Sequence, residues 1–153
     1  MTDKVFLDTR VLFSAVHSET GGARLILQLG EARAIQLWVG PQVLQEANGV
    51  LERKSPASKA YFALLLDRSR VRMGPEAGEA ALETALEVIA YHPDAQVVAE
   101  ALEVGADYLV SFDREHLLGN PQAGRLPFPL GTAGDFLAWY RAKLSGADNP
   151  LLR

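Results

Sequence analysis

Short apolar runs typical of buried strands alternate along the chain with longer stretches in which apolar residues recur at helical spacing. Four runs are predicted as strands, at residues 4–7, 35–39, 71–73 and 107–112. Helices are predicted at residues 11–16, 23–29, 41–54, 56–66, 76–89 and 93–105, with a last helix after a capping-box sequence at 132–135. Strands separated by helices form parallel sheets with both faces covered. The sequence therefore predicts a three-layer α/β/α fold with a mostly parallel central sheet.

The length and composition of the chain fit one folded domain. It has 153 residues, of which 48% are hydrophobic and 22% charged, and it contains no internal repeat or interior linker. We expect the domain to span residues 1–144 and a C-terminal tail to follow at 145–153. The absence of cysteine excludes a disulfide framework, a thiol nucleophile and a zinc site built on thiolates.

Charge and hydropathy restrict the surroundings and partners that we expect. No window of about 18 residues is both uncharged and apolar, and Asp3, Asp8 and Arg10 interrupt the region where a signal peptide would be apolar. The expected location is the cytoplasm, without membrane contact. Fifteen Lys and Arg against nineteen Asp and Glu give a net charge of −4, which disfavours nucleic-acid binding through bulk positive charge. A polyanionic partner would need a local basic patch or bound metal ions.

Two acidic residues follow predicted strands directly. Asp8 comes after the strand at 4–7, and Asp113 comes after the strand at 107–112. Because the carboxyl ends of parallel strands meet at one edge of the sheet, where α/β proteins bind ligands, both carboxylates are candidates for a functional site. Each also suits a local role in a turn or as a helix N-cap.

Two further acids lie on predicted helices beside the apolar stripe. Glu46 is at the flank of its stripe, half turned toward the core, and Asp94 is on the stripe at the start of its helix. An Arg-paired Glu and a buried-side N-cap are the structural alternatives. If the four acids converge, their repulsion calls for a divalent cation, and oxygen ligands without His or Cys suit Mg²⁺ or Mn²⁺. Such a site supports phosphoryl transfer by metal-activated water.

Six segments, in their order and spacing, carry a resemblance to a known family. They are 7–15 (LDTRVLFSA), 43–47 (VLQEA), 50–54 (VLERK), 93–94 (PD), 105–113 (GADYLVSFD) and 134–137 (GDFL). Over most of its length, from residue 5 to about residue 140, the chain resembles the PIN-domain nucleases of the small single-domain kind that includes VapC-type toxins. The resemblance implies a PIN-like fold.

The resemblance also assigns roles to residues. It implies that four acids are the catalytic residues and metal ligands: Asp8, Glu46, Asp94 and Asp113. Thr9 and Ser111 would support them as hydroxyl neighbours. The family usually has Asn after the Asp-Thr pair, where this chain has Arg10. Arg10 would pair with a site acid, contact RNA phosphate or weaken metal binding, and the sequence does not decide among these.

The activity that the resemblance implies is that of a Mg²⁺- or Mn²⁺-dependent endoribonuclease with RNA as its substrate. It further implies the toxin half of a toxin–antitoxin pair, held inactive by a small antitoxin protein, and a homodimer. These are expectations about partners that no residue of this chain establishes by itself.

Basic residues near the predicted site have two interpretations. Arg53 and Lys54 end a predicted helix, and Arg70 lies in an Arg-rich turn between Arg68 and Arg72. Either group is a candidate for binding RNA phosphates around an acidic centre. Both also fit cations at a helix C-terminus or on a solvated face.

The histidines and one other acid are expected to lie outside the metal site. His17, His92 and His116 lack the spacing of a metal triad, and only His116, three residues after Asp113, is a candidate proton shuttle. Asp107 opens its predicted strand, so we expect it at the opposite edge of the sheet as a turn residue.

Two other functional classes compete with a nuclease. A PIN fold without turnover, acting as a nucleic-acid- or protein-binding module, would agree with Arg10 and the negative net charge. A phosphatase or receiver domain also has Asp after its first strand. The phosphatase would need a second Asp at position 10, and the receiver a Lys at a late strand end, whereas Lys143 is in a predicted helix. Gly21 and Gly22 do not form a dinucleotide-binding phosphate loop.

Overall fold

Five parallel strands form the centre of the protein in the computed structural model, which describes residues 2–146. The strands are β1 (Lys4–Leu7), β2 (Gln36–Val39), β3 (Arg72–Met73), β4 (Tyr108–Val110) and β5 (Leu130–Gly131), in the spatial order β3-β2-β1-β4-β5. Phe6 of the central strand pairs with Trp38 of β2 and with Leu109 of β4. This order makes the carboxyl ends of β1 and β4 neighbours.

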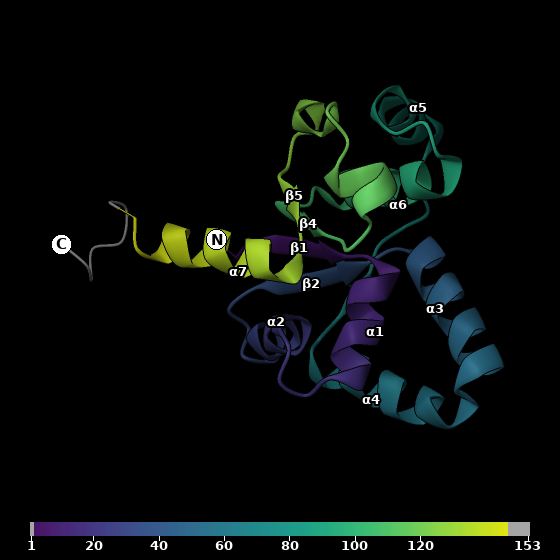
Figure 1. Cartoon of the computed structure of the whole chain (residues 1–153), viewed down its shortest axis with the longest axis vertical. Coiled ribbons are helices and arrows are strands. Elements are labelled where there is room, and N and C mark those ends of the chain that lie inside the picture. Colours follow the sequence, from purple (N-terminus) through teal and green to yellow (C-terminus); the bar gives the residue numbers. More distant parts are fainter. Residues whose placement is uncertain (1, 147–153) are drawn as a thin grey trace.

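Helices cover both faces of the sheet (Figure 1). They are α1 (Thr9–His17), α2 (Gly22–Glu31), α3 (Pro41–Lys54), α4 (Lys59–Arg68), α5 (Glu79–Val88), α6 (His92–Val104) and α7 (Ala133–Leu144). Helices α1, α2 and α7 lie on one side of the sheet, α5 and α6 pack together on the other, and α3 and α4 extend beside α1. The predicted three-layer fold is confirmed, and every strand pair is parallel.

The central strand is buried on both faces, as parallel sheets require. Val5, Phe6 and Leu7 are all fully buried, so consecutive side chains of β1 pack into opposite halves of the core. Helix α3 packs through Val43 and Ala47, which are also fully buried. No helix within residues 2–146 has the length and hydrophobicity needed to span a bilayer.

The structure differs from the predicted elements where the local signal is weak. The edge strand β5 was not predicted, because its two residues follow a Pro-rich loop and have no periodicity, yet Ser111 N–H donates to the Gly131 carbonyl at 2.9 Å. The predicted strand at 107–112 is shorter and ends at Val110. Residues Arg114–Leu118 form a π-helical turn instead of a loop. Residues 147–153, most of the predicted tail, lie outside the described residues.

A buried carboxylate joins α3 to α6. Glu100 of α6 is 3% exposed, and both of its carboxylate oxygens accept from the Gln42 backbone N–H at 3.1 Å. That N–H belongs to the first turn of α3, where backbone donors have no partner within the helix and negative charge is favourable. Burial raises the pKa of Glu100 to about 7 despite this bond. The contact fixes the start of α3 against the helix that carries Asp94.

Candidate functional site

Asp8 lies at the carboxyl edge of the sheet and caps α1. Its Oδ1 accepts from the Thr9 backbone N–H at 2.7 Å, and its Oδ2 accepts from the Ser111 hydroxyl at 2.9 Å. The side chain is almost completely buried. Burial raises the pKa of Asp8, although the bonds from Thr9 and Ser111 and the charge of Arg10 act in the opposite direction. Asp8 therefore combines its predicted N-cap role with a place in the acidic site.

Asp113 lies three residues beyond the end of β4 and caps the π-helical turn. Its Oδ1 accepts from the backbone N–H groups of Glu115 and His116, both at 3.0 Å. Its own N–H donates to Ser111 Oγ at 3.1 Å, so this fully buried hydroxyl links Asp8 and Asp113. Burial acts to raise the pKa of Asp113, but the two backbone donors and the neighbouring Asp94 outweigh it and hold that pKa below its usual range.

Asp94 faces these residues from the start of α6. It is the third residue of the helix, and Tyr91 occupies the N-cap position, so the alternative of an N-cap role for Asp94 is wrong. Burial, together with the charge of Asp113 and a proton shared with it, raises the pKa of Asp94 to about 7. Asp94 and Asp113 therefore behave as a pair in which Asp94 keeps the proton.

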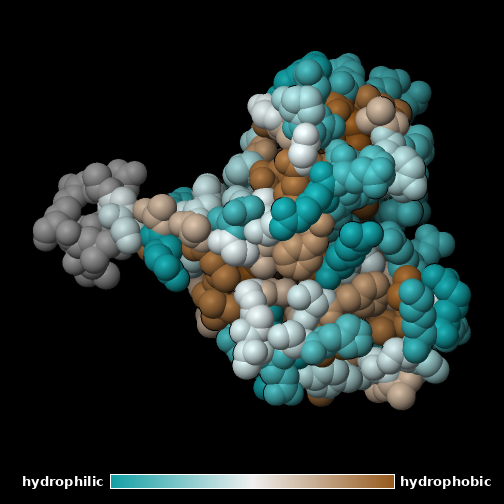
Figure 2. Space-filling model, viewed as in Figure 1, coloured by the Kyte–Doolittle hydropathy of each residue, from teal (hydrophilic) through white to brown (hydrophobic). Residues whose placement is uncertain are grey.

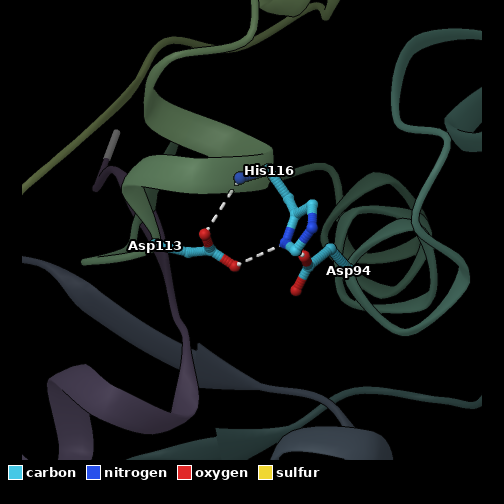
Figure 3. Close-up of side chains that lie close together, drawn as sticks. All are labelled: Asp94, Asp113 and His116. Atoms are coloured by element: carbon cyan, nitrogen blue, oxygen red, sulfur yellow. Dashed lines mark hydrogen bonds and ion pairs between the residues drawn. The ribbon is translucent and has the colours of Figure 1, made fainter.

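A histidine completes the tight cluster (Figure 3). His116 Nδ1 lies 2.9 Å from Asp94 Oδ2 and 3.5 Å from Asp113 Oδ2. The contact with Asp94 is short but not aligned as a hydrogen bond, and within residues 2–146 Asp94 Oδ2 is a buried oxygen without a hydrogen-bond partner. One ligand atom from each of the three residues lies within 4.8 Å of the others. This set fits a divalent cation, because a cation would satisfy that oxygen and relieve the repulsion between the carboxylates.

Glu46 reaches the site from α3. Its Oε2 accepts from the Thr9 hydroxyl at 3.3 Å, and it lines the same pocket as Asp94. The prediction that Glu46 is half turned toward the core is wrong, since the residue is exposed. The reason is that α3 buries Val43 and Ala47, and the flank of this stripe faces the mouth of the pocket.

A pocket of about 1080 Å³ brings the four predicted acids together. It lies between the α6 side and the α3 side of the molecule, where Figure 2 shows an indentation bordered by hydrophilic residues. Three exposed arginines also line it: Arg10, Arg53 and Arg114. Acidic residues and guanidinium groups thus share one pocket, where the arginines lie within reach of a bound anion.

Other predicted residues lie elsewhere. Lys54 is exposed and does not line this pocket. Arg70 precedes β3 at the amino edge of the sheet, where its Nε donates to the Glu31 carbonyl at 3.3 Å, so it lies apart from the acids. Asp107 is also at that edge, as expected, and accepts from the Lys4 backbone N–H at 2.8 Å.

Two residues have roles that the sequence predictions do not include. His116 is predicted only as a candidate proton shuttle, although the Asp-x-x-His spacing at 113–116 places both side chains on one helical turn. No sequence pattern marks the role of Glu100. A Glu within an apolar stripe can be identified as the cap of another helix only when the positions of both helices are known.

Replacing Ser111 with Ala should destabilise the protein more at pH 8 than at pH 4. The variant leaves a buried Asp8 oxygen without its donor, which costs about 1–3 kcal/mol, and the ionised form of Asp8 needs that donor most. Urea unfolding at both pH values measures the effect. Ser58→Ala is the control, because it removes a hydroxyl pair with Ser55 that is distant from the acids. An equal loss at both pH values would contradict the account of Asp8.

Comparisons with known proteins agree with this geometry. A family model described as "PIN domain" matches residues 4–115. A search of curated proteins gives no significant match. Among solved structures, VapBC2 of Rickettsia felis, bound to a DNA fragment from its promoter, matches with a TM-score of 0.61 and 19% identity, over 83% of this chain and 96% of that one.

Two more structures share the fold. Mycobacterium tuberculosis VapC20, a toxin that cleaves the sarcin–ricin loop, matches with a TM-score of 0.50 and 18% identity, over 72% of this chain and 91% of that one. A Pyrobaculum aerophilum protein matches with a TM-score of 0.54 and 16% identity, over 92% of this chain and 90% of that one.

Proposed function

The chain belongs to the PIN-domain family, and on this premise we propose that it is a divalent-metal-dependent endoribonuclease that hydrolyses RNA phosphodiester bonds. The observation that carries the proposal is the convergence of four carboxylates from separate elements on one pocket. They come from the end of β1, from α3, from the start of α6 and from the turn after β4: Asp8, Glu46, Asp94 and Asp113.

Each acid has a distinct part in the proposed reaction. Asp94 and Asp113, supported by Asp8, would hold Mg²⁺ or Mn²⁺, which would supply charge neutralisation and an activated water. Ser111 keeps Asp8 and Asp113 oriented through the two hydrogen bonds of its hydroxyl. Glu46, held by Thr9 at the mouth of the pocket, would position the attacking water or the scissile phosphate.

Arg10 and Arg53 would bind the RNA backbone. Both are exposed and line the pocket, and Arg is suited to bidentate contact with phosphate. Arg10 is also the observation that favours a second candidate function of the protein. Because its charge acts on Asp8, it would weaken cation binding in a PIN-fold module that binds nucleic acid or protein without turnover.

The partners belong to the same proposal. The Rickettsia felis structure holds a VapBC2 assembly on promoter DNA. By analogy, we propose that this chain is the toxin component of a cytoplasmic toxin–antitoxin pair, with a small protein antitoxin as its inhibitor. A homodimer remains a prediction of the family resemblance.

An RNA cleavage assay tests the activity. Purified protein is incubated with a pool of structured and single-stranded RNA in Mg²⁺, in Mn²⁺ and in EDTA, and Asp113→Asn is prepared in the same way to control for contaminating ribonuclease. We expect cleavage that needs the ion and is lost in the variant. If both folded proteins leave the RNA intact in every buffer, the module without turnover is the correct function.

Metal ions should stabilise the protein, and more strongly at pH 8 than at pH 5. A cation at 100 times its Kd adds about 2.7 kcal/mol, which raises Tm by about 5–10 °C for a domain of this size. Protons compete for Asp94, whose pKa of about 7 keeps it protonated at pH 5. Thermal unfolding with Mn²⁺, against choline chloride of equal ionic strength, measures the shift. A shift of the same size at both pH values would contradict the role of Asp94.

A further inference from the structure

The imidazole of His116 occupies the position of a third ligand beside two carboxylates. We propose that His116 binds the catalytic ion through Nδ1 and makes the site select Mn²⁺ over Mg²⁺. The inference rests on the proposed function and adds the residue that decides which ion is used. It also revises the expectation of a purely oxygen-lined site, since a nitrogen atom lies 2.9 Å from Asp94 Oδ2 and 3.5 Å from Asp113 Oδ2.

The spacing of these atoms suits a common ion. Neighbouring ligands of an octahedral ion with bonds of about 2.1 Å are about 3 Å apart, which is close to both distances. Asp94 Oδ2 is buried and lacks a hydrogen-bond partner among the described residues, so the short contact with His116 is not explained by a hydrogen bond. Two arrangements bring these atoms together: an ion pair with a protonated His116, or two ligand atoms that face one ion.

Three contacts surround His116. Its backbone N–H donates to Asp113 Oδ1 at 3.0 Å, which fixes the residue to one of its proposed co-ligands (Figure 3). The ring stacks on Tyr91, with centroids 4.2 Å apart and planes inclined by 14°. On the other side, Nε2 lies 3.8 Å from Glu115 Oε1. Metal-binding histidines usually have a carboxylate or carbonyl at the second ring nitrogen, which orients the ring and makes it a better ligand.

The nitrogen donor decides between the two ions. Mg²⁺ takes oxygen ligands and retains its waters. Mn²⁺ is also suited by carboxylates, but as a first-row transition ion it gains more from an imidazole ligand than Mg²⁺ does. A site made of Asp94 and Asp113 alone would bind both ions through similar contacts. The addition of His116 favours Mn²⁺, because only Mn²⁺ gains substantially from nitrogen.

The competing explanation is that a protonated His116 is only a counter-ion of the two acids. The two explanations predict opposite changes in Mn²⁺ affinity when His116 is removed. Removing a ligand lowers the affinity for Mn²⁺, whereas removing a competing cation raises the affinity for both ions.

Titration calorimetry of Mn²⁺ and Mg²⁺ binding to wild type, His116→Ala and His116→Gln tests the proposal. Wild type should bind Mn²⁺ more tightly, and both variants should lose about tenfold or more in Mn²⁺ affinity with a smaller change for Mg²⁺. His116→Gln retains a polar side chain, so it carries the test if the alanine variant folds poorly. His17→Ala, which removes an exposed histidine from the end of α1, is the matched control and should behave as wild type.

Electron spin-echo spectroscopy of the Mn²⁺-loaded protein gives a readout that does not depend on activity. Nitrogen modulation should be present in wild type and in His17→Ala and absent from both His116 variants. Unchanged or increased Mn²⁺ affinity in these variants, or a wild-type spectrum without nitrogen modulation, would overturn the assignment. If both His116 variants still bind Mn²⁺ as tightly as wild type and Asp94→Asn does not, only this inference is refuted. A wild-type protein that binds neither ion would refute the proposed function itself.

Discussion

Asp94→Asn should abolish RNA cleavage while making the metal-free protein more stable above pH 7. Removal of one proposed ligand should lower activity by at least about a hundredfold, since even residues that merely orient metal ligands contribute 10- to 100-fold. The gain in stability has a separate cause. Asp94 is buried beside Asp113, and its ionised form is costly until a cation compensates it.

The sign of the stability change follows from the pKa of Asp94. The folded protein holds this proton up to about pH 7, whereas the unfolded chain releases it near its ordinary value of 3.8. The folded state therefore binds more protons, and stability is lost as the pH rises from about 4 to about 7. Asn does not ionise, so the variant gains in Tm at pH 8 and has little advantage at pH 4. Each kcal/mol relieved should raise Tm by about 2–4 °C.

Thermal unfolding and RNA cleavage of the same preparations measure both effects. Asp67→Asn is the matched control, because it removes an exposed aspartate at the end of α4 and should change neither quantity. With Mn²⁺ present, the order of stabilities should reverse, since wild type alone keeps the full site. A variant that is inactive but less stable than wild type at pH 8 would show that Asp94 has a structural role instead.

Gly40→Ala should destabilise the fold by about 1–3 kcal/mol, the usual cost of overpacking. A methyl group at this position would overlap the carboxylate of Glu100, including its Cδ atom. Glu100 cannot yield freely, because it is buried and accepts from the first turn of α3. The substitution should displace the start of α3, which carries Glu46, and reduce cleavage as well.

A double variant makes this explanation specific. In Gly40→Ala/Glu100→Ala the two closest overlaps, with Oε2 and Cδ of Glu100, are gone and only the contact with Cβ at 2.8 Å remains. Part of the lost stability should therefore return, and the two changes should not be additive. Gly124→Ala is the control, since a methyl group there meets nothing within 4 Å and should change stability by less than about 0.5 kcal/mol. Urea unfolding gives the four free energies. Strict additivity would mean that Gly40 is needed for another reason.

The long elements were predictable because each has its own local signal. Pro41 starts α3 and Gly105 ends α6 in the left-handed conformation, and both boundaries agree with the sequence analysis. The capping box at Thr132 and Asp135 is also confirmed. The two-residue strand β5 has no such signal, because its place depends on β4 beside it.

The candidate site also has features that the sequence predicts and features that depend on packing. The positions of Asp8 and Asp113 follow from strand order, because both come after neighbouring parallel strands. The exposure of Glu46 and the ring position of His116 depend on how α3 and the π-helical turn pack against the sheet, which no periodicity encodes. Sequence therefore located the acids, whereas the structure showed which of them lie against a nitrogen donor.

The hydroxyl of Ser111 joins residues that are made at very different times. Asp8 is translated 103 positions before Ser111, and the bridge from Asp8 to Asp113 cannot form before β4 pairs with β1. At about 5–20 residues per second, ribosomes need roughly 5–20 s to make the intervening chain. Throughout that interval the growing polypeptide lacks an assembled acid cluster. The proposed nuclease would therefore have no assembled site with which to cleave the message and ribosome that produce it until most of its own chain has been synthesised.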